Sequence, residues 1–437
     1  MQNRRDFLKK SALAGAGMTL GVPAFGNVVG ANDRVNVAVF GTNGRGEYLA
    51  STFARAANCR VTGIGDVDTR AMSKGQQAVV KTGADQPRGE QDFRRFLDDP
   101  DVQAVVIATP DHWHAPMAIM ALDAGKHVYV EKPCSQNPAE GEMLIAKQQN
   151  TGLKVQMGNQ TRSSVSLNRV IGEIHDGLIG KAYAAKAWYA NTRGPIGDHN
   201  FTEVPEWLDW ELWQGPAPRQ EFDALLVHYN WHWFWKYGTG ELLNNGTHEV
   251  DMCRWALQVE YPDQVTSSGG RYHFDDAWET YDTQLASFSF ADGKQIHWDG
   301  RSCNGMPLFE RGRGAVVYGT EGTVLMDRNG YVLFDLQGNE LRKEEEGAQS
   351  VSMDTTGGGN LDELHIANFL RGITEDESLN AEISDARPSV LMCHLGNMAQ
   401  RVGSVLRIDP ETGKPVDNPA AMELWRREYA DGWEPRV

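Results

Sequence analysis

The chain has 437 residues, of which 42 are Lys or Arg and 59 are Asp or Glu, so its formal net charge is −17. This length predicts about two to three domains, and a composition of 41% hydrophobic and 23% charged residues excludes a disordered or collagen-like chain. The acidic balance argues against nucleic acid or an anionic lipid surface as a partner, and the five widely spaced cysteines fit neither a zinc site nor a disulfide scaffold.

The first residues predict an export signal. A twin-arginine sequence, Arg-Arg-Asp-Phe-Leu-Lys, begins at Arg4 and precedes a weakly apolar run at 11–22 and a stretch of small residues. A charged start, a short apolar run and small residues form an export signal, and the twin arginine resembles the Tat type. The run is too short for stable membrane insertion. We expect removal of residues 1–31, the Tat export machinery as a partner and a periplasmic or secreted location. The alternative is a retained amphipathic helix or anchor.

The next segment has the order of a dinucleotide-binding unit. An apolar strand is expected at 35–40, a Gly-rich turn at 41–46 and a helix at 47–57. A second strand at 60–65 then ends in Asp66. Strand, Gly-rich turn, helix, strand and acid, in this order, predict a fold that binds a dinucleotide.

The individual residues of this unit predict its cofactor contacts. Gly41 permits a tight turn, and Gly46 lets the helix pack close to the sheet, so that the helix N-terminus meets the pyrophosphate. Asn43 replaces the central glycine, and Asn tolerates the left-handed backbone better than most residues. Asp66 favours NAD because a carboxylate repels a 2′-phosphate, although Arg70 leaves NADP open. We expect contacts from Gly41, Asn43, Gly44, Arg45, Gly46, Asp66 and Arg70.

The alternation of strands and helices continues. Strands are expected at 102–108, 127–130 and 153–158, with helices at 115–124 and 138–150 between them. Ligands of open parallel sheets bind at the carboxyl ends of the strands. The polar residues that follow these three strands are therefore further expected cofactor contacts, namely Thr109, Pro110, His112, His114, Glu131, Lys132 and Asn159.

The middle of the chain is rich in aromatic residues. Seven of the 13 tryptophans lie between Trp188 and Trp235, and the segment 228–237 alternates aromatic and imidazole groups. Aromatic faces stack on sugar rings while His, Asn and Tyr bind hydroxyl groups, so this composition indicates a carbohydrate site. His228, His232 and His248 could also converge on a metal, but their spacing is no defined metal motif and we expect none. The expected substrate contacts are Trp113, Arg162, His228, Tyr229, Trp231, His232 and Asp251.

The last third of the chain is dominated by strand-like patterns. Alternating and apolar segments with Gly turns between them predict several strands. Charged and Gly-rich residues at 341–360 predict an exposed loop. The expected strands are 282–290, 295–298, 314–319, 322–326 and 330–334, followed by helices at 361–371 and 389–405 and a polar segment from 409 to 437.

Several motifs together resemble the Gfo/Idh/MocA family, which includes glucose–fructose oxidoreductase and inositol dehydrogenase. They are the Gly-rich turn at 41–46, Thr-Pro-Asp-His-Trp-His at 109–114, Glu-Lys-Pro at 131–133 and the segments 208–216 and 240–251. The resemblance covers nearly the whole mature chain. It implies an α/β N-terminal Rossmann domain and an α+β C-terminal domain with a large, mostly antiparallel sheet. The nicotinamide would lie in the cleft between them.

The resemblance also sets the expected domain boundaries. We expect a signal peptide at 1–31, an NAD(P)-binding domain at 32–158, a substrate and oligomerisation domain at 159–405 and a surface-wrapping tail at 406–437. An exposed antiparallel sheet implies a homodimer or a tetramer, as in the family.

Three residues are candidates for catalysis through this resemblance. The family lysine of Glu-Lys-Pro, here Lys132, lies near the nicotinamide and the reacting hydroxyl group, where like charge would lower its pKa. Family members often place Asp and His four residues apart on one helical face, and here these positions are Asn244 and His248. Because Asn carries no charge, it cannot orient His248 as Asp would. His248 is the candidate base.

The expected reaction is hydride exchange between a sugar and a tightly bound NAD. A periplasm offers no free pool of nicotinamide cofactor, so the cofactor must be regenerated in place by a second sugar or within one reaction cycle. The alternative is a redox-neutral glycosidase or lyase, which oxidises, eliminates, hydrates and reduces its substrate. The secreted glycosidase branch carries Tyr-x-Thr-His, whereas residues 245–248 match only Thr-His. A non-enzymatic alternative is a nucleotide-loaded sugar-binding protein.

Overall fold

The computed structural model describes residues 34–346 and 360–437. The expected export signal at 1–31 and most of the expected loop at 341–360 lie outside these ranges. No helix within them is long and apolar enough to cross a membrane.

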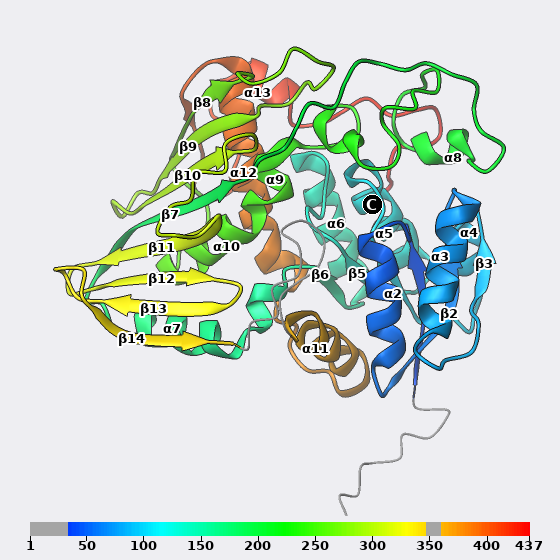
Figure 1. The fold of residues 1–437 in the computed structure, drawn as a ribbon, viewed down its shortest axis with the longest axis horizontal. Helices are drawn as coiled ribbons and strands as arrows, with labels where there is room; N and C mark the ends of the chain where they lie inside the picture. Colours follow the sequence, from blue (N-terminus) through cyan, green and yellow to red (C-terminus); the bar gives the residue numbers. More distant parts are fainter. Residues whose placement is uncertain (1–33, 347–359) are drawn as a thin grey trace, which may run out of the picture. The chain divides into compact units, whose positions relative to one another are not determined.

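The first half of the described chain forms a six-stranded parallel sheet with the order β3-β2-β1-β4-β5-β6 (Figure 1). This is the strand order of a dinucleotide-binding fold, as the sequence predicts. The buried strands are almost continuously apolar because helices cover both faces of such a sheet. The strands are β1 (Val35–Phe40), β2 (Cys59–Gly65), β3 (Arg88–Glu90), β4 (Ala104–Ile107), β5 (His127–Val130) and β6 (Val155–Met157).

The helices between these strands include two that the sequence analysis did not predict, α3 and α4. The helix expected at 115–124 starts earlier, at Asp111, because Pro110 is pre-organised for a helix start. The polar motif after β4 therefore forms the first helical turn instead of a loop. The helices are α2 (Arg45–Arg55), α3 (Thr69–Val80), α4 (Arg94–Leu97), α5 (Asp111–Asp123) and α6 (Pro138–Thr151).

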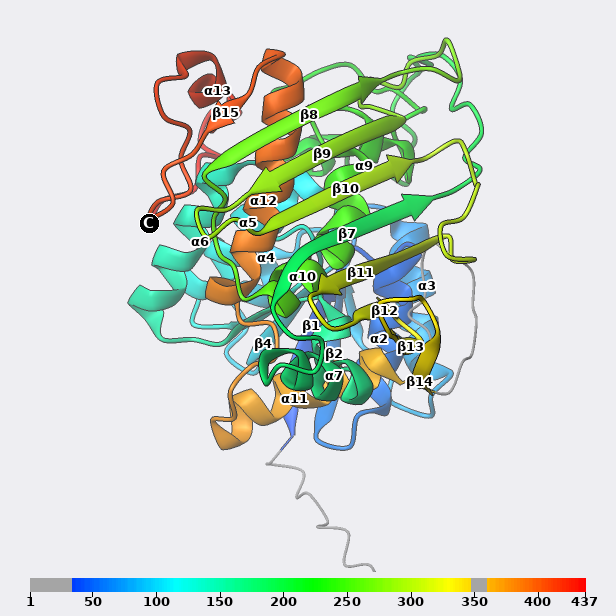
Figure 2. The ribbon, with the colours of Figure 1, turned by 90° about the vertical axis from the view of Figure 1, so that its left-hand side faces the viewer.

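The second sheet has nine strands in the order β14-β13-β12-β11-β7-β10-β9-β8-β15 (Figure 2). Only β7 and β10 pair in parallel, so the sheet is mostly antiparallel, as expected. Residues 341–345 of the loop expected at 341–360 instead belong to an edge strand that pairs with β13. The strands are β7 (Ala182–Ala190), β8 (Gln264–Gly270), β9 (Thr283–Ser289), β10 (Gln295–Arg301), β11 (Arg313–Gly319), β12 (Thr323–Asp327), β13 (Gly330–Phe334), β14 (Glu340–Glu345) and β15 (Leu406–Arg407).

Helices cover one face of the second sheet, and Figure 2 shows α10 and α12 behind β7 to β10. The segment expected as one helix around Asn244 and His248 is broken at Asn245, where α9 ends and α10 begins. The remaining helices are α7 (Val165–His175), α8 (Trp210–Gln214), α9 (Gly240–Asn244), α10 (Gly246–Leu257), α11 (Leu361–Glu375), α12 (Ile383–Val402) and α13 (Pro419–Glu423), with 3-10 turns at Gln160–Ser163 and Asn230–Trp233.

Segments from the end of the chain pack on the first sheet. Phe369 of α11 contacts the rings of Phe53 and Tyr129 in the core of the dinucleotide-binding fold. The C-terminal Trp433 packs edge-on against Trp113 at 5.1 Å between ring centroids. The last residues thus stabilise the N-terminal fold as well as covering the surface.

Candidate active site

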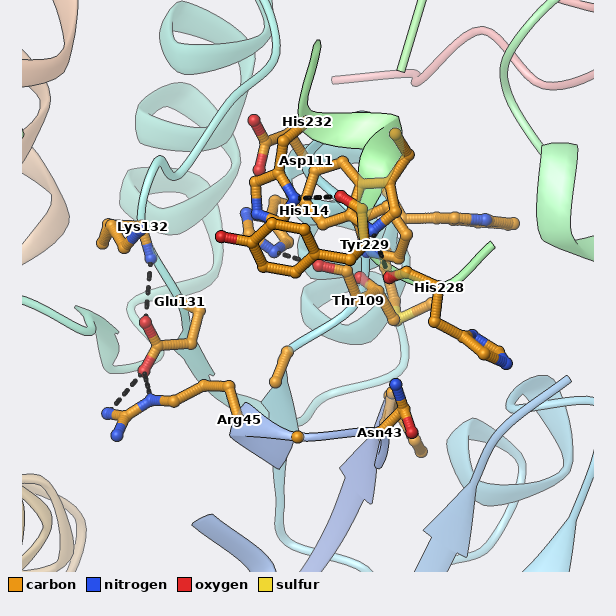
Figure 3. A pocket seen from close by; sticks show the side chains of 18 of the residues that line it. Asn43, Arg45, Thr109, Asp111, His114, Glu131, Lys132, His228, Tyr229 and His232 are labelled. Atoms are coloured by element: carbon orange, nitrogen blue, oxygen red, sulfur yellow. Dashed lines mark hydrogen bonds and ion pairs between the residues drawn. The ribbon is translucent and has the colours of Figure 1, made fainter. Parts of the chain in front are cut away.

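A pocket lies at the carboxyl ends of β1, β4 and β5 and is closed on its other side by α10, the second sheet and the aromatic segment (Figure 3). Most of the expected site residues line it. Six do not: Gly46, Arg70, His112, Asn159, Arg162 and Asp251. Those that line it are Gly41, Asn43, Gly44, Arg45, Asp66, Thr109, Pro110, Trp113, His114, Glu131, Lys132, His228, Tyr229, Trp231, His232, Asn244 and His248.

The Gly-rich turn has the geometry of a phosphate cradle. Gly41 and Gly44 have φ of 77° and 70°, which side chains rarely adopt. A Cβ on Gly46 would lie 1.7 Å from the Gly41 carbonyl oxygen, so close packing excludes any larger residue there. A Cβ on Gly44 would meet nothing within 4 Å, and no side chain caps the N-terminus of α2. The first N–H groups of α2 are thus available for a pyrophosphate, and Gly46 acts through packing.

Asp66 lies where a ribose would bind. Its two carboxylate oxygens accept hydrogen bonds from the backbone N–H groups of Thr42 at 2.6 Å and Asp68 at 2.9 Å. Burial raises the pKa of Asp66, and these two N–H groups offset part of that rise. Arg70, expected to contact the cofactor, is outside the lining. It pairs with Asp68 at 2.8 Å and stacks on Trp207 at 3.3 Å from the ring centroid.

Arg45 organises the acid that precedes Lys132. Its guanidinium donates to Glu131 at 2.8 Å and to Asp362 of α11 at 2.5 Å, and the first of these contacts is drawn in Figure 3. Gln160 also donates to Glu131, at 3.2 Å. Asp362 has no motif around it, and it enters the network only because α11 packs on the first sheet.

The two histidines of the 109–114 motif have different positions. His114 lines the pocket, and its ring nitrogens lie 2.6 and 2.7 Å from the carbonyl oxygens of Pro133 and Thr109. His112, expected to bind cofactor, is instead fully buried with Nε2 at 2.9 Å from the carbonyl oxygen of Trp213. Burial lowers the pKa of His112 to about 3. His112 is therefore a neutral structural residue.

Asp111 is a pocket residue that the sequence analysis did not select. It is 3% exposed, and its carboxylate accepts a hydrogen bond from the hydroxyl group of Thr239 at 2.6 Å. Burial raises the pKa of Asp111. It places an acid near Lys132, whose charge partly opposes that rise.

Lys132 is held by Asn244. Its Nζ donates to the side-chain oxygen of Asn244 at 3.0 Å and also to the Asn244 backbone carbonyl. Both acceptors are neutral. Burial lowers the pKa of Lys132 in spite of the opposing charges of Glu131 and Asp111. The side chain is thereby biased toward the uncharged amine, which can accept a proton.

His248 takes its orientation from Asn159 and not from Asn244. Its Nδ1 lies 2.8 Å from the side-chain oxygen of Asn159, and Nε2 has no hydrogen-bond partner in the part of the chain that the structure describes. Burial, and then the charges of Arg328 and Lys132, put the pKa of His248 well below its usual value. A neutral imidazole with Nδ1–H donated to Asn159 leaves Nε2 as a base on the pocket wall.

The aromatic segment forms the opposite wall, where Figure 3 shows Tyr229 and His232 across from Lys132. His232 stacks on Trp231 with 3.6 Å between ring centroids, and burial lowers the pKa of His232 to about 3. His228 pairs with Asp68 at 2.6 Å, and so ties this segment to the start of α3. Tyr229 is 40% exposed at the pocket.

These pocket histidines do not gather as metal ligands. His228 and His248 bind different partners, Asp68 and Asn159. Among residues 34–346 and 360–437, the group with metal-ligand spacing is His273, Asp282 and Cys303, outside the pocket lining. Asp282 already accepts hydrogen bonds from two backbone N–H groups, at 2.7 and 3.2 Å.

Arg162 and Asp251, expected to contact substrate, instead bind each other. Arg162 donates to both carboxylate oxygens of Asp251, at 2.6 and 2.8 Å, and Ser389 adds a third hydrogen bond at 2.6 Å. Burial would raise the pKa of Asp251, but Arg162 outweighs it and the pKa is lowered. We call Arg162, Asp251, Arg254, Asp385 and Ser389 the closed cluster.

Two arginines that line the pocket, Arg313 and Arg328, were not selected in the sequence analysis. Arg313 begins β11, and Arg328 lies in the turn between β12 and β13. Neither belongs to a motif, and only the pairing of these strands brings them to His248. We call Lys132, His248, Arg313 and Arg328 the open cluster.

Two family models match the chain. One, described as an oxidoreductase family with an NAD-binding Rossmann fold, matches residues 35–159. The other, described as the C-terminal alpha/beta domain of an oxidoreductase family, matches residues 184–327. Together they cover more than half of the chain.

Curated relatives match over less than half of their length. A glycosyl hydrolase family 109 protein of Saccharopolyspora erythraea is 30% identical over 214 residues, which are 44% of this chain and 46% of that protein. Glycosyl hydrolase family 109 protein 2 of Shewanella sp. strain ANA-3 is 31% identical over 208 residues, 43% of this chain and 46% of that protein. The chain thus spans less than half the length of these relatives.

Solved structures share the fold over most of the chain. An NAD binding oxidoreductase from Klebsiella pneumoniae has a TM-score of 0.66 at 19% identity, covering 86% of this chain and 100% of that one. A levoglucosan dehydrogenase in complex with NADH and levoglucosan has a TM-score of 0.65 at 19% identity, with 85% and 99% covered. An aldose-aldose oxidoreductase from Caulobacter crescentus has a TM-score of 0.65 at 18% identity, with 86% and 100% covered.

Proposed function

Because the chain belongs to the Gfo/Idh/MocA oxidoreductase family, we propose that it exchanges hydride between a sugar or sugar derivative and a tightly bound NAD. One observation carries the proposal. Lys132 and His248, both with lowered pKa values, line the same pocket as the Gly-rich turn. Two groups that can accept protons thus lie beside a site with the geometry of a dinucleotide cradle.

The chain's own residues fit the cofactor. The backbone of Gly41 to Arg45 would hold the pyrophosphate, and Asp66 would accept hydrogen bonds from the ribose hydroxyl groups. NAD supplies an acceptor and donor of hydride when bound. NAD is favoured over NADP because the Asp66 carboxylate would repel a 2′-phosphate, and Arg70 is held by Asp68 and Trp207 outside the pocket lining.

Lys132 would receive the proton of the reacting hydroxyl group. Asn244 holds Nζ by two acceptors, so the amine is fixed in place. Burial lowers its pKa, which raises the share of the uncharged amine that can accept a proton at a given pH. His248 Nε2 is a second base, positioned by Asn159. The aromatic wall with Trp231 and His232 would pack against the sugar ring and exclude water.

The purified protein tests this proposal without added cofactor. Sugar is added, and reduced nicotinamide is followed by its near-ultraviolet absorbance. We expect reduction in the wild type, reoxidation by a second sugar, and no reduction in Lys132→Gln although nucleotide is still bound. Lys147→Gln, which replaces a lysine paired with Asp123 outside the pocket lining, is the matched control. Bound sugar without reduction of any kind would favour the nucleotide-loaded binding protein instead.

A second candidate is the redox-neutral glycosidase or lyase. The relatives named glycosyl hydrolase family 109 favour it, as does the presence of two bases. One base would take the hydroxyl proton, and His248 could take a C–H proton next to the new ketone before the glycosidic bond leaves. Proton NMR of a glycoside panel in D2O separates the candidates. Cleavage with deuterium beside the oxidised carbon supports the glycosidase, whereas an accumulating keto-sugar or lactone supports net oxidation.

We also propose Tat-dependent export to the periplasm or medium, on the strength of the N-terminal sequence, and assembly into a homodimer or tetramer. The uncovered face of the second sheet supports the assembly, because Leu285 and Tyr183 are 51% and 46% exposed there. Fractionation of cells expressing the wild type and Arg4→Lys/Arg5→Lys tests export. Light scattering of the wild type and Leu285→Glu tests assembly.

A further inference from the structure

Arg328 is a cation without a partner in the pocket. It lies in the turn between β12 and β13, lines the pocket and is only partly exposed. It makes no hydrogen bond or ion pair with any residue that the structure describes. The adjacent acid, Asp327, is not available to it, because Asp327 pairs with Arg311 at 2.6 Å.

A second guanidinium lies beside it. Arg313 donates to one carboxylate oxygen of Glu249 at 2.7 to 2.8 Å, and Glu249 is only 1% exposed. Burial and the charge of Arg313 lower the pKa of Arg328 to about 10, while Glu249 opposes this effect. Glu249 and Asp362 both act on Arg328, but each is already bound to another arginine, Glu249 to Arg313 and Asp362 to Arg45.

The other acids of the pocket do not balance this excess. Glu131 and Asp362 are both bound to Arg45, and Lys132 is bound only to neutral oxygens of Asn244. In a chain with a net charge of −17, acidic side chains are plentiful, yet none among residues 34–346 and 360–437 pairs with Arg328. Removing an unpaired charge from water is costly, so a site that retains one is suited to a ligand that supplies the opposite charge.

Arg328 belongs to the reacting end of the pocket. Its charge is the first of those that lower the pKa of His248, and it also lowers the pKa of Lys132. The pyrophosphate is expected instead at the Gly-rich turn, where the N-terminus of α2 is uncapped. Arg45 at the start of α2 also acts on Arg328, so the two ends of the pocket are close. We expect the anion at Arg328 to belong to the sugar, and the nucleotide content of Arg328→Gln separates this from a contact with the cofactor phosphates.

We propose that the substrate is an anionic sugar whose carboxylate binds to the Arg328 guanidinium, with Arg313 adding to the positive field. The planar fork of an arginine matches a carboxylate by two parallel hydrogen bonds. A sulfate ester shares this chemistry, so uronic or aldonic acids and sulfated sugars are two sources of one interaction. This inference rests on the proposed sugar oxidoreduction at the same site.

The test compares matched sugars in the assay of bound-cofactor reduction. Glucuronate and galacturonate are set against glucose and galactose, and glucose 6-sulfate against both. We expect the wild type to prefer an acidic sugar. Arg328→Gln should lower the ratio of kcat/KM for the acidic sugar to kcat/KM for the neutral sugar by about 30-fold, as for a truncated buried charge pair. Arg328→Lys should retain part of the preference.

Matched variants and a second readout keep the outcomes distinct. Arg342→Gln, an arginine of β14 paired with Glu173 outside the pocket lining, is the control. Equal losses for acidic and neutral sugars in Arg328→Gln, or a loss of bound nucleotide, would overturn the inference while sugar oxidation stands. If no sugar reduces the cofactor, the proposed function fails, and calorimetric titration still decides the inference. Tighter binding of the acidic sugar that Arg328→Gln abolishes supports it, and equal binding of both sugars refutes it.

Discussion

Among the buried titratable side chains of helix α10, His248 and Asp251 lie three residues apart, and their surroundings differ. Asp251 belongs to the closed cluster, where Arg162 and Ser389 engage its carboxylate. His248 belongs to the open cluster, where Asn159 binds one ring nitrogen and the other faces the pocket without a partner among the described residues. Both residues are almost fully buried.

Burial alone therefore does not distinguish the two clusters. They differ in whether the chain itself provides hydrogen-bond and ion-pair partners for the buried groups. Each charge of the closed cluster has an opposite charge or hydrogen bond from the chain itself. In the open cluster, Arg313 is paired with Glu249, Lys132 is bound only to neutral oxygen atoms, and Arg328 and one imidazole nitrogen of His248 have no partner among the described residues. A ligand can gain binding energy only where the chain has left groups unpaired.

The largest expected effect is on the reaction rate and comes from a substitution in the open cluster. Lys132→Gln removes the proton acceptor and should slow single-turnover reduction of the bound cofactor by about 10²- to 10⁴-fold. Nucleotide content, measured after heat release, should remain as in the wild type. A rate like that of Lys147→Gln would show that the reaction does not use the open cluster.

The next largest effect is on the free energy of unfolding and comes from a substitution in the closed cluster. Asp251→Asn removes the bidentate partner of the buried Arg162, leaves it only the half-exposed Asp385 as a counter-charge, and should cost about 3 kcal/mol, seen as a fall in Tm. Because the folded pKa of Asp251 is lowered, its contribution is present above the unfolded pKa and disappears as the pH falls through the folded one. The control is Asp417→Asn in the exposed Arg407–Asp417 pair, expected within about 0.5 kcal/mol of the wild type. A similar Tm for both variants would contradict the comparison.

A smaller effect on catalysis should follow from giving His248 of the open cluster a charged partner, as Asp251 has in the closed cluster. Asn159→Asp places a carboxylate on Nδ1 of His248 and should raise the pKa of this imidazole. Where His248 acts as the base, the acid limb of the pH profile then moves toward neutral pH. NMR titration of the histidine measures the same shift directly. The exposed substitution Asn339→Asp should leave both readouts in place, and an unmoved limb in Asn159→Asp would remove His248 from the reaction.

The smallest effect is the pH dependence of the wild type. Lys132 accepts a proton only when uncharged, so the rate should rise with pH, by at most about tenfold per pH unit, and level off below the usual lysine pKa of about 10.4. Initial rates across a buffer series measure this limb. Its persistence in Lys132→Gln would assign it to another group.

The sequence predicts the first sheet better than it predicts the site. Strands β1 and β5 have the expected bounds because a buried parallel strand is a continuous apolar run. Polar groups at strand ends, such as Glu131, also lie where the fold rule places them. His112 and Asp251 were misassigned because a motif shows residue types and not which side of a helix meets the pocket. Arg328 and Asp362 could not be predicted, since strand pairing and the packing of α11 bring them in from distant parts of the chain.

The packing of α11 determines when, during synthesis, the dinucleotide-binding fold can be completed. The apolar cluster around β1 and α2 includes Ile366, Phe369 and Leu370. The backbone carbonyl oxygen of Trp425 also accepts a hydrogen bond from the backbone N–H of Ala139, in the first turn of α6. The dinucleotide-binding fold, although encoded first, is therefore incomplete until nearly the whole chain has been synthesised. A chain whose synthesis stops before residue 370 therefore has a nucleotide domain with an exposed apolar face.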